Sequence, residues 1–592
     1  MPAPKKRHQE LIADVMAMPD GPQVAAFFDF DGTLIYGYSA IPFIREQVRQ
    51  GKLASREFME LAGAMTSFGL GNMGFSAMMV VTSQFMRGET EESYWDFGEA
   101  LYKKHIARLV YPESRALVDA HLEKGHTVAI ISSATPYQIT AAARDLGISN
   151  VACTELEVKD GVLTGAVRRP TCFGYGKVRA AEQIAKASGA DLDQSFFYSD
   201  SDDDLELLER VAYPRPLNPN RRLTAIAKQR EWPIRRFKSR GRPGLGDWAR
   251  SLAATGSLIT SFAAGLPIWA ITGSKRSAQN FSYSLFADTA RALIGMDLKV
   301  RGEENLWSQR PAVFIFNHQS KADLVVAASL VRRDLAGVGK KEIKRMPVIG
   351  QVLEFGGMVA IDRENARSAI EAMAPLVDAI REDGRCVLLA PEGTRTVSPR
   401  LGPFKKGAFH LAMQAGVPIV PIVIHNALDV APKGDFVFRP ATVEVDVLPP
   451  VDTSGWTART MNQHVKDVRD LYLQVLGQSE DESGSGSSRS DSAAPSSTPK
   501  AQSKRKPKTQ PKAKPKPKPK TKIKPDAKTR TKPAARTKAK TAPVDQKRSR
   551  PARSASKTSA KRPVTGRKPA SGERSKGKRK PAAVKTGTSE RS

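Results

Sequence analysis

Short apolar runs that stop at polar residues are the feature of this sequence that most restricts its fold. In the first half these runs alternate with the helix-like stretches 113–125 and 176–188, and they lie at 24–30, 127–132 and 195–199. Four similar runs follow in the second half, at 312–316, 357–361, 386–390 and 417–424. Buried strands that alternate with helices are typical of parallel sheets. We therefore expect two α/β domains in succession.

The positive charge of the chain is concentrated at its C-terminal end. The 592 residues carry a formal net charge of +32, but residues 500–592 hold 34 Lys and Arg residues against four acidic ones, so residues 1–499 are nearly neutral. We interpret 478–592 as a disordered tail rich in Lys, Pro and Ala, because few large apolar side chains are present to offset the entropy of ordering it. The simplest interpretation is that the tail is solvated and binds nothing. It could also attract anionic lipid, or bind nucleic acid through phosphates but without base stacking.

The cysteine content and the N-terminus indicate a compartment. Three cysteines are an odd and sparse set, which excludes a disulfide framework and a Cys-type zinc site and fits a reducing environment. The first 22 residues lack the apolar core of a secretory signal. We therefore expect the protein in the cytoplasm or on the cytoplasmic face of the cell membrane.

A cluster of aspartates forms the first chemical centre. The first apolar run leads directly into Asp29-Phe30-Asp31-Gly32, so two carboxylates two residues apart follow the end of a strand. The second run ends at Ser132, whose hydroxyl and backbone N–H suit a phosphate, and the third ends in a run of acids that includes Asp200. Lys177 supplies a cation. Packed carboxylates repel one another unless a cation such as Mg²⁺ neutralises them.

This ordered set resembles the haloacid-dehalogenase (HAD) superfamily of phosphatases, close to its phosphoserine-phosphatase-like branch (subfamily IB), over about residues 20–215. The resemblance implies a Rossmann-like domain with a helical cap at about 36–111. It implies that Asp29 is the nucleophile, which forms an aspartyl-phosphate, that Asp31 is the general acid and base, and that Asp204 supports the metal site. It also implies that Ser132 and Lys177 bind phosphate. Mg²⁺ would be bound by Asp29, the backbone carbonyl of Asp31, and Asp200.

One position departs from the phosphoserine phosphatases that the first half resembles. Those enzymes carry a Glu nine residues after the nucleophile, which pairs with the amino group of serine, whereas this chain has Tyr38 there. Phosphoserine is therefore an expectation from likeness that this residue does not support.

A histidine and an aspartate five residues apart form the second centre. Run 312–316 ends at Asn317-His318, and Asp323 follows, so the carboxylate can reach back to one ring nitrogen and leave the other as a base toward a hydroxyl. Downstream lie Arg363 and Arg395, which can each grip a phosphate with two hydrogen bonds. Lys405 and Lys406 are equally well explained as a solvated basic turn.

These motifs, NHxxxxD, IDR, EGTR and VPIVP in that order, resemble the 1-acyl-sn-glycerol-3-phosphate acyltransferases over roughly 295–450. The resemblance implies a second α/β domain of the glycerolipid-acyltransferase type. It implies that His318 deprotonates the sn-2 hydroxyl of lysophosphatidate, that Asp323 orients His318, and that acyl-CoA or acyl carrier protein (ACP) is the donor. Four residues would bind or shape the acceptor phosphate site: Arg363, Glu392, Gly393 and Arg395.

Residues 251–274 contain no charge and follow seven basic residues between 228 and 242. Their length could span a bilayer core of roughly 30 Å. A single crossing would separate the second domain from cytosolic acyl donors, and Gly and Pro interrupt the segment. We therefore favour an interfacial or re-entrant hairpin on an anionic membrane surface. A single span, with or without a return through 281–296, and a buried helix of a soluble domain are the alternatives.

The sequence thus predicts a bifunctional enzyme of phospholipid biosynthesis that makes phosphatidate and hydrolyses a phosphomonoester. We expect a phosphatase domain at 1–225, a basic linker at 226–250, a membrane-associated segment at 251–300, an acyltransferase domain at 301–477, and the tail. The alternative is a membrane-surface or nucleic-acid adaptor that uses its basic tail and has one or both domains inactive. The intact catalytic motifs argue against it.

Overall fold

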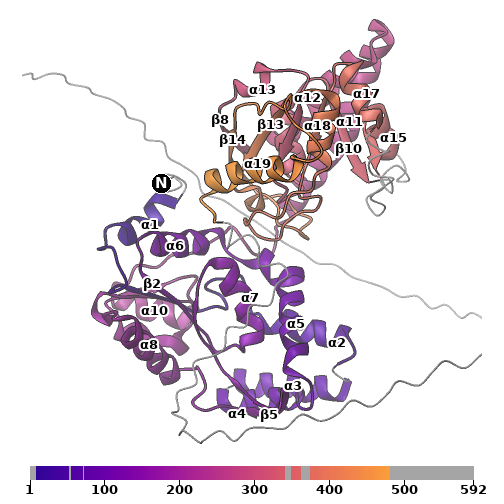
Figure 1. Ribbon diagram of the computed structural model, residues 1–592. Coiled ribbons are helices and arrows are strands. Elements are labelled where there is room, and N and C mark those ends of the chain that lie inside the picture. Colours follow the sequence, from indigo (N-terminus) through magenta and orange to yellow (C-terminus); the bar gives the residue numbers. More distant parts are fainter. Residues whose placement is uncertain (1–7, 53–54, 71–72, 341–348, 362–373, 480–592) are drawn as a thin grey trace, which may run out of the picture. The chain divides into compact units, whose positions relative to one another are not determined.

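The computed structural model describes residues 8–479 apart from 53–54, 71–72, 341–348 and 362–373. Residues 480–592 of the predicted tail, and Arg363, lie outside the described residues. Within the described residues, each half of the chain forms one large β-sheet with helices packed around it (Figure 1). The predicted fold class of two successive α/β domains is confirmed.

The first sheet is parallel throughout and has the strand order β3-β2-β1-β6-β7. Its strands are β1 (Ala25–Phe28), β2 (Thr127–Ile131), β3 (Asn150–Ala152), β6 (Phe196–Ser199) and β7 (Tyr213–Pro216). Ala26 and Phe28 of β1 belong to a core cluster with residues of α6 (Pro112–Glu123), whereas Ala25 and Phe27 pack with α8 (Tyr175–Ser188). Because both faces are covered, the three central strands β2, β1 and β6 are buried on both sides, as the sequence pattern indicated.

The remaining elements of this half fall into three groups. The predicted cap contains α2 (Ala40–Arg49), α3 (Ser55–Gly69), α4 (Phe75–Gln84) and α5 (Glu91–Leu101), followed by short turns to Leu109. Between β2 and α8 lie α7 (Pro136–Leu146) and the hairpin of β4 (Leu156–Lys159) and β5 (Val162–Val167). The others are α1 (Gln9–Met16), α9 (Leu205–Arg210) and α10 (Arg221–Gln229).

The predicted linker at 226–250 begins inside the first domain. The backbone N–H of Asn218 donates to the carbonyl of Arg235 at 2.8 Å, and its side-chain oxygen accepts from the N–H of Phe237 at 2.7 Å. Phe237 also packs against the core of that domain. The basic residues of this stretch had suggested a solvated connection, but α10 and these bonds hold its first part to the sheet.

The uncharged segment forms one continuous helix, α11 (Leu245–Thr272), which is followed after a two-residue turn by α12 (Lys275–Ile294). Gly265 allows the two helices to pack closely, because a Cβ there would lie 2.2 Å from Oγ of Ser282. The hairpin therefore consists of α11 and α12 and does not lie within 251–274. In the described residues α11 is the one helix long and apolar enough to cross a membrane, which is weak evidence by itself.

The second sheet has the strand order β11-β10-β12-β9-β13-β14-β8, and all described pairs are parallel except β13 with β14. Its strands are β8 (Met296–Arg301), β9 (Val313–Phe316), β10 (Leu335–Lys340), β11 (Val359–Ile361), β12 (Cys386–Leu389), β13 (Ile419–Ile424) and β14 (Ala441–Val447). The main helices around it are α14 (Asp323–Val331), α15 (Ile349–Phe355), α17 (Ala374–Arg381), α18 (Gly407–Ala415) and α19 (Met461–Leu476). The central strand β9 leads directly to His318.

Candidate active sites

The aspartate motif lies at the carboxyl end of β1. The backbone N–H of Asp29 donates to the carbonyl of Tyr198 at 2.9 Å, which ties the motif to β6. Gly32 has a φ of +74°, and a Cβ there would lie 2.1 Å from Oδ2 of Asp200. The glycine is therefore needed both for the turn and for the close approach of the Asp200 carboxylate.

Lys177 joins the acidic segments of this site. It lies near the start of α8 and its Nζ donates to Oδ1 of Asp29 at 2.9 Å and to the carboxylate of Asp204 at 2.8 Å. The Ser199 hydroxyl also donates to Asp204, at 2.7 Å. Burial lowers the pKa of Lys177, but the carboxylates of Asp204 and Asp29 outweigh burial and raise it overall. The lysine therefore carries its charge in this buried site.

Ser132 is buried directly after β2, as predicted. Its backbone N–H donates to the carbonyl of Ala152 at 3.0 Å, and its hydroxyl accepts from the N–H of Ala134 at 3.3 Å. The N–H that the sequence suggested for phosphate binding is thus used by β3. The hydroxyl is the group of Ser132 that can still donate a hydrogen bond.

Asp31 is held by residues that the sequence analysis missed. Its carboxylate accepts from the backbone N–H of Ser39 at 2.7 Å and from the Ser39 hydroxyl at 3.1 Å. Gln138 on α7 donates to the same hydroxyl at 3.1 Å. Gln138 is recognisable from the sequence only as part of the capping box with Thr135 that begins α7.

Burial raises the pKa of three carboxyl groups here, to about 6 for Asp29, about 7 for Asp31 and about 8 for Asp200. Repulsion among the carboxylates adds to the effect, and Lys177 opposes it at Asp29. No group of three or more His, Cys, Asp or Glu side chains in the described residues is arranged to hold a metal. Two carboxylates and the Asp31 carbonyl are nevertheless a donor set that fits a hard cation such as Mg²⁺.

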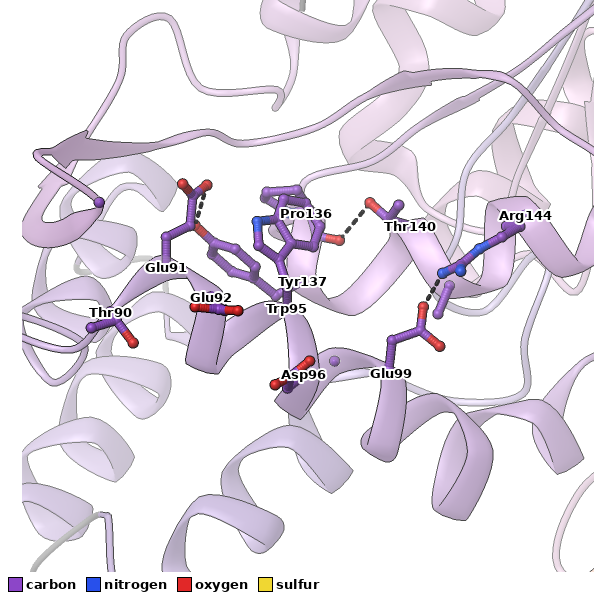
Figure 2. Close-up of a pocket in the computed structure, with 13 residues that line it drawn as sticks. Thr90, Glu91, Glu92, Trp95, Asp96, Glu99, Pro136, Tyr137, Thr140 and Arg144 are labelled. Atoms are coloured by element: carbon purple, nitrogen blue, oxygen red, sulfur yellow. Dashed lines mark hydrogen bonds and ion pairs between the residues drawn. The ribbon is translucent and has the colours of Figure 1, made fainter. Parts of the chain in front are cut away.

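A pocket of about 630 Å³ lies between α5 and α7 of the first half (Figure 2). Figure 2 shows Trp95 beside Tyr137, with the Glu99 carboxylate turned toward Arg144. None of the predicted site residues lines it. Tyr137 belongs to the first turn of α7, one residue before Gln138, so the pocket and the Asp31 site share this helix.

The second centre has the geometry that the spacing of His318 and Asp323 predicts. His318 follows β9, Asp323 begins α14, and Nδ1 of His318 lies 2.8 Å from Oδ2 of Asp323. The same oxygen accepts the backbone N–H groups of Gln319 at 2.7 Å and Ser320 at 2.8 Å. Asp323 is fully buried, which raises its pKa although these bonds oppose the rise.

Glu392 holds the catalytic loop from the opposite side. Its Oε1 accepts the backbone N–H of His318 at 2.6 Å, and its Oε2 accepts the N–H of Gly402 at 2.9 Å. The N–H of Thr396 donates to the His318 carbonyl at 2.8 Å. Burial raises the pKa of Glu392 to about 7. The sequence analysis took Glu392 for a substrate-binding residue, whereas both of its described carboxylate contacts are with the protein backbone.

The cationic residues lie around the same loop. Arg395 follows Glu392 after β12, and its carbonyl accepts from Nζ of Lys433 at 2.6 Å. Gly393 has a φ of +72°, and a Cβ there would lie 2.9 Å from Nζ of Lys405. Lys405 is therefore close to the EGTR turn. Lys433 was not predicted, because it lies in none of the motifs named above.

Comparison with known proteins matches each half separately. Residues 26–209 match the family described as haloacid dehalogenase-like hydrolase, and residues 297–425 match the acyltransferase family. The chain is 36% identical over 193 residues to a 1-acyl-sn-glycerol-3-phosphate acyltransferase of Limnanthes douglasii, which covers 33% of this chain and 68% of the relative.

Two further relatives each match one half of the chain. A 1-acyl-sn-glycerol-3-phosphate acyltransferase alpha of Mus musculus is 33% identical over 213 residues, covering 36% of this chain and 74% of its own length. A phosphoserine phosphatase of Mycobacterium tuberculosis is 32% identical over 219 residues, covering 36% of this chain and 71% of its own length. Both predicted resemblances are confirmed.

Proposed function

Because this chain belongs to the haloacid dehalogenase-like hydrolases in its first half and to the 1-acyl-sn-glycerol-3-phosphate acyltransferases in its second, we propose that it makes phosphatidate and also hydrolyses a phosphomonoester. The observation that carries the acyl transfer is the His318–Asp323 pair at 2.8 Å, with Asp323 fully buried. The adaptor alternative is not favoured, since both domains retain their catalytic motifs.

In acyl transfer, His318 acts as the base. The Nδ1–H of His318 donates a hydrogen bond to Asp323, which leaves Nε2 free to remove the proton of the sn-2 hydroxyl of lysophosphatidate. The resulting oxygen nucleophile attacks the thioester carbonyl of acyl-CoA or acyl-ACP, and the thiolate leaves. Arg395, with Arg363, holds the acceptor phosphate, and the Gly393 turn lets the chain approach that site.

In phosphate hydrolysis, Asp29 attacks phosphorus and carries the phosphoryl group. Asp31, held by Ser39, donates a proton to the leaving alcohol and then takes one from the attacking water. Ser132 and Lys177 bind phosphoryl oxygens. Asp29, Asp200 and the Asp31 carbonyl would hold Mg²⁺, which would supply positive charge to offset the charge of the phosphoryl oxygens.

The phosphatase substrate is an alcohol phosphate other than phosphoserine. Tyr38 occupies the position of the amine-binding Glu, and the surrounding aspartates add to the effect of burial in raising its pKa. A phenol in place of a carboxylate provides no counter-charge for an ammonium group. Substrates for a panel are glycerol 3-phosphate, lysophosphatidate and phosphatidate, with phosphoserine as the reference.

We place the protein at the cytoplasmic face of the cell membrane. The α11–α12 hairpin exposes large apolar side chains, among them Leu252 at 75% and Ile271 at 84%. Trp269 contacts Phe355 of α15, so one side of α11 faces protein while these residues face outward. Such a helix can lie in a lipid interface and bring the domain to its amphiphilic acceptor.

The two activities are tested by two variants of the full chain. His318→Ala should abolish acyl transfer to lysophosphatidate and leave phosphate release intact, and Asp29→Asn should do the reverse. Loss of both activities in either variant would contradict two independent sites. Wild-type protein that binds vesicles or DNA but turns over neither substrate class would favour the adaptor.

A further inference from the structure

A chain of hydrogen bonds runs from the start of α7 to the carboxylate of Asp31. Thr135 precedes α7, and its backbone N–H and its hydroxyl both donate to Oε1 of Gln138, at 3.0 and 2.8 Å. Nε2 of Gln138 donates to the Ser39 hydroxyl at 3.1 Å. That hydroxyl donates to Oδ2 of Asp31 at 3.1 Å, and the Ser39 N–H donates to Oδ1 at 2.7 Å. Both oxygens of Asp31 are therefore held by Ser39, and Ser39 is held by Gln138.

The direction of every bond in this chain follows from one obligatory donor. A backbone N–H can only donate, so the atom of Gln138 that faces the Thr135 N–H is the carbonyl oxygen Oε1. The other end of the amide is then the NH₂ group, which donates to Ser39. A hydroxyl has one proton, and because Ser39 receives a hydrogen bond from Gln138 it directs that proton to Asp31. The capping box of α7 thus sets the orientation of the Ser39 hydroxyl.

These side chains are buried, where an unmet hydrogen bond is costly. Ser39 is fully buried, and Thr135 and Gln138 are 5% and 7% exposed. Ser39 is also the residue before α2, yet its side chain caps no N–H of that helix. A serine at this position usually bonds to the helix that follows. Here the hydroxyl is directed to Asp31 instead, so the contact is not a by-product of helix capping.

We propose that Gln138 is a positioning residue of the phosphatase site, which acts through Ser39 to keep the proton of Asp31 available to the leaving oxygen. This inference rests on the proposed phosphate hydrolysis. In that reaction the Asp29 carboxylate forms a bond to phosphorus, the bond from phosphorus to the leaving oxygen breaks, and the Asp31 proton moves to that oxygen. Without the bond from Gln138, the Ser39 hydroxyl can rotate and accept the Asp31 proton itself. The proton is then turned away from the leaving oxygen.

The test compares variants of the full chain on two phosphate esters in the presence of Mg²⁺. Gln138→Met removes the amide and keeps an unbranched side chain of similar length, and Ser39→Ala removes the hydroxyl. Gln47→Met is the matched control, because Gln47 is another buried glutamine of this half and donates to the Tyr94 hydroxyl at 2.9 Å. 4-Nitrophenyl phosphate releases a weakly basic phenolate, whereas benzyl phosphate releases a strongly basic alkoxide that needs a proton.

The quantity to measure is kcat/KM, which includes only the steps up to the aspartyl-phosphate and so leaves out the later role of Asp31 with water. Gln138→Met should lower kcat/KM for benzyl phosphate by about tenfold to a hundredfold, and that for 4-nitrophenyl phosphate by less than about threefold. Gln47→Met should lower neither. The double variant Ser39→Ala/Gln138→Met should match Ser39→Ala, because Gln138 acts through Ser39. Unchanged values, equal losses for both esters, or losses that multiply in the double variant overturn the inference.

Hydrogen exchange keeps this result separate from the proposed reaction. The Ser39 amide donates to Asp31, so its exchange rate, measured by mass spectrometry of the peptide that contains it, reports this contact without turnover. Gln138→Met should speed that exchange by about threefold or more, and Gln47→Met should not. If wild-type protein hydrolyses neither ester but the exchange responds in this way, the proposed reaction fails and the positioning of Asp31 by Gln138 stands. Unchanged exchange in Gln138→Met refutes the positioning itself.

Discussion

Replacing Glu392 by Gln separates its structural cost from its effect on His318. The two carboxylate oxygens accept two backbone N–H groups, from His318 and from Gly402, and the residue is 5% exposed. Glutamine has one oxygen and one NH₂ group. One of the two backbone donors must therefore face another donor, and the chain at His318 or at Gly402 has to move.

Two opposing terms set the effect on stability. Below pH 7 Glu392 is mostly protonated, and glutamine leaves one buried backbone N–H without an acceptor, which costs roughly 1–3 kcal/mol. Burial raises the pKa of Glu392 from its usual 4.5 to about 7, so the ionised form costs the folded state about 3 kcal/mol above pH 7. Glutamine avoids that cost. At pH 8 the two terms nearly cancel, and we expect the free energy of unfolding to change by no more than about 1 kcal/mol.

The sign of the pH dependence follows from the raised pKa. Between about pH 4.5 and 7 the folded state binds more protons at Glu392 than the unfolded state, so its contribution to stability falls as the pH rises and is fully lost above pH 7. Glu392→Gln lacks this dependence. Relative to wild type, the variant should be less stable by about 1–3 kcal/mol near pH 5 and nearly equal at pH 8.

Calorimetry between pH 5 and 8, with kcat and KM for both substrates at pH 8, measures the two effects. We expect kcat to fall at least tenfold while KM for lysophosphatidate changes less than threefold, because a shift of His318 affects the base more than the binding of the acceptor. Glu303→Gln, an exposed exchange in the same domain, is the control. A raised KM with unchanged kcat would refute the reasoning and support the predicted role of Glu392 in substrate binding.

Three further predictions concern the two sites. Gly32→Ala should reduce phosphate release at least a hundredfold and leave acyl transfer within twofold, because its Cβ would meet the Asp200 carboxylate at 2.1 Å and its backbone has a φ of +74°; a colorimetric phosphate assay measures this. Asp323→Asn should lower kcat of acyl transfer about a thousandfold, since a neutral amide no longer stabilises the imidazolium that forms when His318 takes the hydroxyl proton, while melting temperature shifts little. Chelation with EDTA should abolish phosphate release but not acyl transfer, and restoration by Mg²⁺ completes that test.

The parts of both sites that could be predicted from the sequence are the local ones. Asp29 and Asp31 lie two residues apart after a strand, and His318 and Asp323 lie five apart, so strand and helix geometry fixes where they meet. The supporting residues come from other segments. Lys433 reaches Arg395 from 38 positions along the chain, and no pattern around either residue indicates that the two meet.

Two causes explain three of the strands that the apolar runs did not predict. Strands β8 and β14 alternate apolar and polar residues, as in Val443-Glu444-Val445-Asp446, which is the pattern of half-buried strands and not of fully apolar runs. Strand β7 contains Pro214 and Pro216, and proline argues against a strand in isolation. As an edge strand of its sheet β7 tolerates them, but the sheet order is not visible in the sequence.

Tyr38 shows why likeness to a family predicts the reaction better than the substrate. The reacting groups are fixed by chemistry: a phosphoryl group needs a nucleophile and an acid, and a hydroxyl needs a base. Substrate contacts can instead come from any segment that reaches the site, and one exchange such as Tyr38 for Glu removes a counter-charge. Specificity therefore has to be inferred from residues outside the shared motifs, and the substrate panel for phosphate release measures it directly.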